Sequence, residues 1–257
     1  PASLRMRFGR AWLKAGRALE ARESFQASNR LRPSREASDG ITRTYVLAED
    51  PAGAARHLEA HAQAYPDDLD AATLYAESIM DLRPWNYWTR DGRPYDQTHD
   101  IIDALDGVLK RDEDHPGALH YWIHLWEGSN TPERAEAAAD RLLPLAPGAG
   151  HLVHMPSHID VRRGRWSQAM LANEKAIEAD RRYNEQVPRQ GFYGLYISHN
   201  YHMRAYAAMM IGRSGEALHA IDRMVARMPE DWKKEYSGIA DGFTAMPLEV
   251  RLRFGKW

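Results

Sequence analysis

The sequence predicts an all-α protein made of about six helix-turn-helix repeats. It is rich in the helix formers Ala, Arg, Glu and Leu, and it lacks runs of β-branched residues with period-two alternation. Apolar residues recur at helical spacing, for example over 134–143, 168–179 and 215–227. Prolines divide these stretches at regular intervals: Pro33, Pro66, Pro116, Pro147 and Pro229. The 257 residues are many for one compact core but ordinary for stacked repeats, so we expect a single repeat domain over 1–257.

The first repeat, at about 2–35, shows the pattern most clearly. Large apolar residues, small residues and a terminal proline follow one another in it: Phe8, Gly9, Trp12, Gly16, Ala21, Phe25 and Pro33. Over a period of about 34 residues this pattern resembles the tetratricopeptide repeat, whose small residues let helices A and B approach closely. The resemblance implies a right-handed superhelix with a concave groove. The stretches MDLRPWNYW, HPGALHYWIH, HLVHMPSHI and SHNYH also resemble uncharacterised bacterial tetratricopeptide proteins with histidine-rich helices, a resemblance that implies no reaction.

The remaining repeats follow in order, and two inserts interrupt them. We expect them at about 35–68, 69–115, 116–149, 150–183 and 198–231, with an incomplete repeat at 232–257. Helix A of the third repeat is predicted at 69–82. Aromatic inserts without a helical pattern are predicted at 83–96 and 184–197. RFGKW at the C-terminus matches the helix A–helix B junction RRGRW at 162–166, so we expect a piece of a longer array or a last repeat completed elsewhere.

Composition excludes several classes of function. The formal charge is −2 without a basic block, which argues against nucleic-acid binding. No apolar run approaches the ~20 residues that span a bilayer, and no charged-plus-apolar leader is present, so a cytoplasmic location is favoured. The sequence has no cysteine, so any metal must be held by nitrogen and oxygen ligands.

Histidines occur in a periodic pattern. Seven of the twelve lie in three short clusters: His120, His124, His151, His154, His158, His199 and His202. The resemblance implies that positions 2, 5 and 9 of each repeat line the concave groove, and the seven fill seven of the nine such positions in three successive repeats. Even scattering of twelve histidines would put only about 0.4 there. We therefore predict that the seven meet in space and hold a transition metal.

Imidazole ligation limits the choice of metal. Neutral imidazole suits copper, zinc, iron and nickel, whereas the scarcity of carboxylates argues against calcium and magnesium. Seven imidazoles are enough for two ions, as in an all-histidine dicopper centre, or for one ion with histidines left for proton transfer. Copper with redox or dioxygen chemistry is the first choice, zinc with hydrolysis the second, and haem held by two histidines the third. A non-catalytic scaffold that binds a protein or peptide is the alternative; the substrate would be a small molecule or a peptide.

Other residues are candidates for supporting roles. Glu77, Glu127 and Tyr206 could orient a ligand, act as a base or donate a proton. Aromatic residues of the two inserts could close a lid over the groove or simply pack the inserts onto the scaffold: Trp85, Trp88, Phe192, Tyr193 and Tyr196.

Two further features of the sequence bear on the histidine prediction: the remaining histidines and a proline within one of the clusters. Five further histidines are expected to make ordinary contacts: His57, His61, His99, His115 and His219. Pro156 interrupts the cluster at 150–158, so either the helix starts late or a kink directs His151 and His154.

Overall fold

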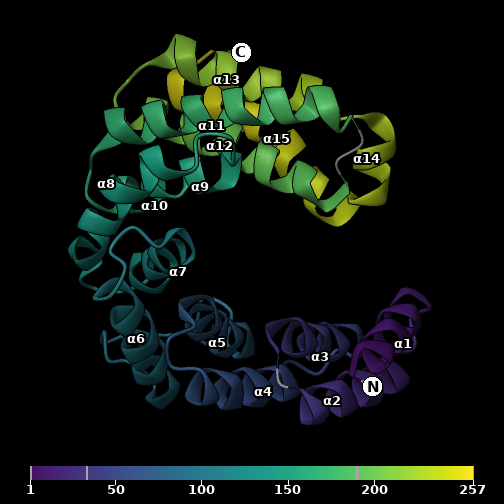
Figure 1. The fold of residues 1–257 in the computed structure, drawn as a ribbon. Helices are drawn as coiled ribbons and strands as arrows, with labels where there is room; N and C mark the ends of the chain where they lie inside the picture. Colours follow the sequence, from purple (N-terminus) through teal and green to yellow (C-terminus); the bar gives the residue numbers. More distant parts are fainter. Residues whose placement is uncertain (1, 33, 189–190, 257) are drawn as a thin grey trace. The chain divides into compact units, whose positions relative to one another are not determined.

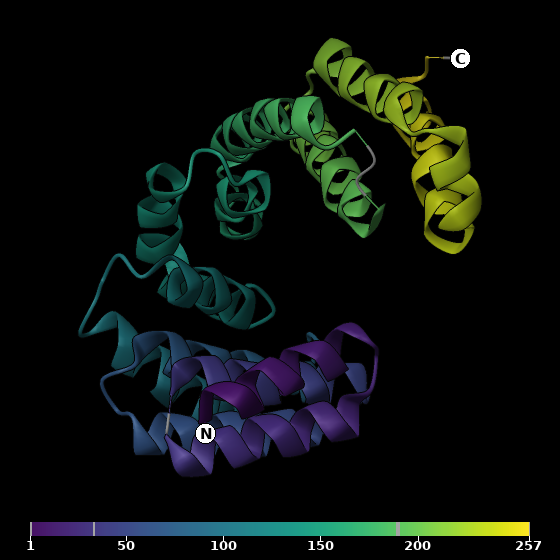
Figure 2. The ribbon, with the colours of Figure 1, turned by 45° about the vertical axis from the view of Figure 1, so that its right-hand side comes forward.

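The computed structural model describes residues 2–32, 34–188 and 191–256, apart from the side chains of residues 46 and 47, and their regular elements are helices (Figures 1 and 2). The described residues also contain an isolated antiparallel bridge between Trp88 and Pro94. The prediction of an all-α fold is confirmed. Pro33, which was expected to end the first repeat, lies outside the described residues. No described helix combines the length and the apolar character that crossing a membrane requires.

The helices form two compact units, Pro1–Glu113 and Asp114–Trp257. In the first unit each helix packs against the next one along the chain. The helix predicted at 69–82 is present with these bounds. The first insert joins the fifth helix to the sixth. The helices are α1 (Ala2–Lys14), α2 (Ala18–Leu31), α3 (Arg35–Leu47), α4 (Pro51–Ala64), α5 (Leu69–Leu82) and α6 (Asp96–Leu109).

Small residues set the close packing of the first three helices. The Phe25 ring of α2 is 1% exposed. A Cβ added to Gly9 of α1 or to Gly40 of α3 would lie 2.7 Å from that ring. A glycine side chain is a single hydrogen atom, which leaves room for the Phe25 ring between the backbones of α1 and α3. The two glycines are therefore required for the packing.

The second unit carries all the residues of the predicted histidine clusters. Its helices again pack on their neighbours, with α12 in contact with α9, α11, α13 and α15. The elements are α7 (Pro116–Glu127), η1 (Pro132–Ala135), α8 (Glu136–Leu145), α9 (Gly150–His154), α10 (Pro156–Arg162), α11 (Trp166–Gln186), η2 (Gly191–Tyr193), α12 (Gly194–Met210), α13 (Ser214–Arg227), α14 (Glu230–Glu235) and α15 (Ser237–Phe254).

The second insert is shorter than predicted. α11 continues to Gln186 and α12 begins at Gly194, so the helix includes residues that we expected in a loop. Packing explains the longer α12. The Trp232 indole donates a hydrogen bond to the carbonyl of Gly191 (2.9 Å) and lies so close to Gly194 that a Cβ there would be 2.6 Å from Nε1. Because Trp232 lies on α14, more than thirty residues later in the chain, the local sequence pattern could not reveal this contact.

The helix around Pro156 does not start late, and it is interrupted at Met155. The chain is already helical from Gly150, Met155 has helical dihedral angles (φ −50°, ψ −40°), and Pro156 begins α10. The Met155 amide still donates to the carbonyl of His151 (3.1 Å). The interruption therefore divides the histidines of this stretch between two short helices.

The packing around Phe25 gives a first prediction. Gly9→Ala should lower the free energy of unfolding by about 1–3 kcal/mol, the usual cost of overpacking a core. Urea unfolding followed by circular dichroism measures the change. Gly107→Ala on α6 is the matched control, because a Cβ there meets nothing within 4 Å. That variant should gain up to about 1 kcal/mol from helix propensity, and a loss as large as that of Gly9→Ala would contradict the packing explanation.

Candidate metal centre

Six histidines of the second unit form two trios. Within each trio, one ligand nitrogen per residue lies within 4.8 Å of the others. The first trio comes from α7 and α9, and the second from α9, α10 and α12. The first trio is His120, His124 and His151; the second trio is His154, His158 and His199.

The rings of the first trio converge on one point between α7 and α9. Nε2 of His120 lies 3.0 Å from Nε2 of His151. The ring centroids of His120 and His124 are 4.8 Å apart, as expected for residues one helical turn apart. The Nδ1 atom of His151 is buried and has no hydrogen-bond partner within the described part of the chain.

The second trio is the more deeply buried. His154 is fully buried, and its Nδ1 donates to Oδ1 of Asn173 (2.7 Å). The Asn173 amide is itself oriented, because its Nδ2 donates to the carbonyl of Ala169 (2.8 Å). In a neutral His154 the proton is thus on Nδ1, and Nε2 carries a lone pair. That Nε2 lies 2.8 Å from Nε2 of His158.

Glu127 at the end of α7 connects the two trios. Its Oε1 accepts from Nδ1 of His124 (2.7 Å), and its Oε2 pairs with Nδ1 of His158. One carboxylate therefore orients one ring of each trio. The two trios are also neighbours, with ring centroids of 5.6 Å between His124 and His158 and 6.0 Å between His151 and His154.

These contacts leave facing lone pairs in the second trio. Glu127 holds the proton of a neutral His158 on Nδ1, and Asn173 does the same for His154. Both Nε2 atoms then present lone pairs to each other across 2.8 Å. With both rings neutral this arrangement is repulsive; a second proton on His158, paired with Glu127, or a metal ion bound by both nitrogens would remove the repulsion.

Burial favours the neutral form of four of these imidazoles by lowering their pKa values. It is the largest cause that lowers the pKa of His120 to about 2, of His199 to about 3 and of His151 to about 4, and the neighbouring histidines lower these values further. Burial also lowers the pKa of His154 well below its ordinary value. For Glu127, burial alone would raise the pKa, but the charge of His158 and the hydrogen bonds from both histidines outweigh it, so the pKa is lowered. The site thus combines four imidazoles that burial holds neutral with one carboxylate that pairs with His124 and His158.

The other predicted site residues belong to neither trio. His202 adjoins the second trio without joining it, with its ring 6.3 Å from that of His199 and 6.4 Å from that of Phe243. Tyr206 packs against Trp166 at a centroid distance of 5.9 Å. Glu77, Trp85 and Trp88 belong to the first unit, whereas both trios belong to the second.

The aromatic residues of the second insert have separate roles. Tyr196, on the first turn of α12, lies edge-on to His151 with ring centroids 4.7 Å apart. Tyr193 donates its hydroxyl to Oδ1 of Asp180 (2.9 Å), which ties the start of α12 to α11. Phe192 is 58% exposed beside Tyr196. Tyr196 therefore covers one side of the first trio, while Tyr193 packs the insert onto the scaffold.

Two supporting residues were not predicted from the sequence. Asn173 orients His154, and Asp180 accepts from Tyr193 and from Nδ2 of Asn200 (2.8 Å). Burial raises the pKa of Asp180, although these two donors offset part of the effect. A Cβ on Gly150 would lie 2.0 Å from Oδ1 of Asp180, so this carboxylate also lies against the start of α9. On the buried face of α11, Asn173 and Asp180 are the two polar residues among mostly small apolar ones. This break in the apolar pattern is the feature of the sequence that could have identified them.

Three of the remaining histidines make ordinary contacts. Nε2 of His57 lies 3.0 Å from the Ser38 hydroxyl. His115 precedes α7, and its Nδ1 accepts from the amide of Ala118 (3.2 Å). His61 lies beside Asp68 (3.8 Å).

Comparisons with known proteins identify the fold. No protein family and no curated protein matches the sequence. A crystal structure of a tetratricopeptide repeat protein from Parabacteroides merdae is similar with a TM-score of 0.61 at 14% identity, over 99% of this chain and 91% of that chain. Two crystal structures of MamA are similar with TM-scores of 0.51, at 18% and 17% identity, over 76% and 77% of this chain and 98% and 93% of theirs. The chain has the tetratricopeptide-repeat fold, and at these identities the likeness is one of fold alone.

Neutral buried histidines predict a pH dependence of the metal-free protein. His120 with a pKa of about 2 stays neutral in the folded state, whereas in the unfolded chain it takes up a proton below its ordinary value of 6.5. The stability is therefore fully present above that value and falls with the pH at up to about 1.4 kcal/mol per unit for each such histidine. His120→Gln should make the fall between pH 7 and 4.5 shallower in urea unfolding of the apoprotein.

The control variant for this measurement is His219→Gln, which replaces an exposed histidine of α13. It should keep the slope of the unchanged protein. An equal slope for His120→Gln and the unchanged protein would show that His120 is protonated to the same extent in both states.

Proposed function

We propose that this chain is a transition-metal protein, an enzyme whose dinuclear centre is held by the two histidine trios. The observation that supports the proposal most directly is the convergence of three ligand nitrogens within 4.8 Å in each trio. Adjacent trios of neutral imidazoles, linked by one carboxylate, suit two ions held side by side.

Three protein ligands for each ion favour a reactive site over a structural one. Structural zinc sites use four protein ligands, whereas catalytic sites use three and leave a position for water or substrate. The edges of the site reach solvent, since the side chains of His124 and His158 are 16% and 17% exposed. A small molecule could therefore approach both ions from this side.

Copper is the metal we favour. Both trios are all-nitrogen, and copper in such a ligand set supplies redox and dioxygen chemistry. Zinc is second, and in the same ligands it would lower the pKa of bound water for hydrolysis. Glu127, whose two oxygens pair with Nδ1 of His124 and His158, would orient these ligands and not act as the base. Haem fits less well, because each trio brings together three imidazole nitrogens, whereas a haem held by two histidines would use two of them.

The protein's own residues would orient the ligands. Glu127 holds the rings of His124 and His158 by their Nδ1 atoms, which directs Nε2 of each ring away from the carboxylate. Asn173 holds His154 in the same way. Such partners fix the tautomer and raise the basicity of a ligand imidazole. Tyr196 would shield the first trio from one side.

A scaffold that binds a peptide is the second candidate. Repeat solenoids offer extended surfaces for such partners, and the tetratricopeptide-repeat fold supports this function without further evidence from the site. Six clustered imidazoles, one fully buried and five partly buried, would be costly to desolvate in such a scaffold, whereas metal binding would use them as ligands.

Metal content distinguishes the two candidates. Protein purified without a histidine tag and reconstituted with Cu(II) or Zn(II) should contain about two equivalents by elemental analysis, one for each trio. His124→Ala and His158→Ala should each lose about one equivalent or more. His219→Ala, on α13 outside both trios, should retain the full amount. Visible and EPR spectra then separate copper or haem from zinc. Less than about a tenth of an equivalent of any transition metal after reconstitution would exclude the proposal.

Glu127→Gln tests how the two trios are linked. The amide keeps the shape of the side chain but removes the charge that both Nδ1 atoms face, so metal affinity should fall by about 10–100-fold. Competition with a chelator of known affinity measures the change for both ions. Glu133→Gln is the matched control, because the Glu133 side chain is 46% exposed on η1 and contacts Arg163. Unchanged affinity in Glu127→Gln would mean that the carboxylate does not support the ligands.

A further inference from the structure

The two trios differ in how their rings are held. In the second trio two of the three rings are held through Nδ1, that of His154 by Asn173 (2.7 Å) and that of His158 by Glu127. In the first trio Glu127 holds the ring of His124 in the same way (2.7 Å). Hydrogen bonds of this kind fix the tautomer of a ligand imidazole and raise its basicity. The second trio is therefore the better prepared to bind an ion.

The acceptor of His154 is itself fixed in orientation. Asn173 is fully buried, and its Nδ2 donates to the carbonyl of Ala169 (2.8 Å), so its Oδ1 faces the histidine. The proton of a neutral His154 is then on Nδ1, and the lone pair on Nε2 points toward His158 before any ion is bound. Because this ring is ordered on folding, binding an ion costs little further ordering.

His151 of the first trio is in the opposite situation. Its Nε2 lies 3.0 Å from Nε2 of His120, and its buried Nδ1 has no hydrogen-bond partner within the described part of the chain. When Nε2 of a neutral imidazole binds an ion, the proton of the ring is on Nδ1. In His151 this proton would be buried without an acceptor, which lowers the affinity of the first trio for an ion.

One carboxylate supports the backbone beside both trios. Asn200, the residue after His199, is fully buried and donates from Nδ2 to Asp180 (2.8 Å). The same carboxylate lies against Gly150, the residue before His151. The difference between the trios therefore comes from the hydrogen bonds of the ring nitrogens.

We infer that the trios bind their ions in order, with the second trio filled first and about tenfold more tightly or better. The inference rests on the proposed metal function. Loss of one supporting hydrogen bond of this kind weakens metal binding by about 10–100-fold, and the second trio has one more of these bonds than the first. At limiting metal the protein therefore holds one ion, in the second trio. Filling of the first trio then completes the dinuclear centre and controls the proposed reaction.

Titration of the metal-free protein with Zn(II) against a competing chelator of known affinity tests the order. The unchanged protein should bind one equivalent in a tight phase and a second equivalent about tenfold more weakly or worse. His151→Ala should keep the tight phase and lose the weak one, whereas His154→Ala should lose the tight phase. Loss of the tight phase in His151→Ala, with the tight phase kept in His154→Ala, would overturn the inference.

Asn173→Leu tests the physical cause. Leucine has a similar volume but accepts no hydrogen bond, so the tight phase should weaken by about 10–100-fold toward the weak one. Two equivalents still bound, together with thermal melting, show that the unit remains folded. Asn173→Asp still accepts from Nδ1 of His154 and should keep the tight phase. An unchanged tight phase in Asn173→Leu would contradict the role given to this hydrogen bond and overturn the inference.

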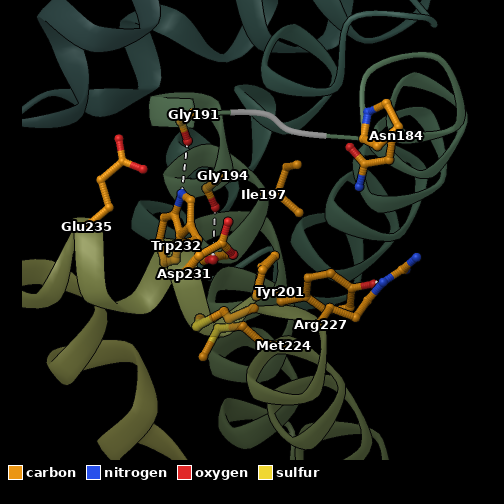
Figure 3. Close-up of a pocket in the computed structure, with 14 residues that line it drawn as sticks. Asn184, Gly191, Gly194, Ile197, Tyr201, Met224, Arg227, Asp231, Trp232 and Glu235 are labelled. Atoms are coloured by element: carbon orange, nitrogen blue, oxygen red, sulfur yellow. Dashed lines mark hydrogen bonds between the residues drawn. The ribbon is translucent and has the colours of Figure 1, made fainter.

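Two control variants lie outside the trios, and both should keep both phases. Gln168→Leu makes a comparable change from an amide to leucine at an exposed position of α11. Tyr201→Phe removes the hydroxyl that accepts from Nη1 of Arg227 (2.9 Å) in a separate pocket of about 270 Å³, bordered by α12, α13 and α14. Figure 3 shows Tyr201 and Arg227 together in this pocket. At about 100° per residue, Tyr201 lies on the side of α12 away from His199.

The same titration separates failure of this inference from failure of the proposed function. No bound equivalent of Zn(II), or of Cu(II) under the same conditions, would exclude the metal function and the order with it. Two equivalents bound with equal affinity would leave the metal function in place and overturn only the order of filling.

Discussion

The carboxylate of Glu127 is the contact on which the candidate site depends. It pairs with Nδ1 of His124 on its own helix and with Nδ1 of His158 on α10, so one side chain orients a ring of each trio. Both hydrogen bonds lie in a mostly buried environment, where an ionic contact is stronger and an unpaired charge is more costly. The same carboxylate therefore stabilises the packing of α7 on α10 and sets the direction in which the ring nitrogens point.

The helical scaffold supplies the remaining constraints. Short inter-helix contacts bring residues far apart in the sequence, such as His154 and His199, into one trio. The interruption at Met155 puts His154 and His158 on successive short helices, with Nε2 atoms 2.8 Å apart. Asp180 holds α11 against the starts of α9 and α12 through Tyr193, Asn200 and close approach to Gly150.

The second unit joins this site to a separate pocket through one helix. α12 presents His199 to the trios and Tyr201 to the pocket, because a turn of 100° per residue puts neighbouring residues on different sides. The α11–α12 connection supports both, with Tyr196 against His151 and Gly191 bonded to Trp232. The second insert therefore borders both the first trio and the pocket beside α14.

The sequence alone was enough for the fold class and the position of the histidine clusters, because helical periodicity, breakers and repeat register are local properties of the chain. Six of the seven predicted histidines meet in two trios, and only the tertiary structure showed that His202 remains outside them. It also decided that Tyr196 lies on α12, since the packing that extends this helix comes from Trp232 on α14. The roles of Glu127, Asn173 and Asp180 depend on atoms from separate helices meeting within hydrogen-bond distance. Such contacts arise from packing and leave no periodic signal, so the sequence determined which residues could ligate a metal, and the tertiary structure decided how they are grouped and oriented.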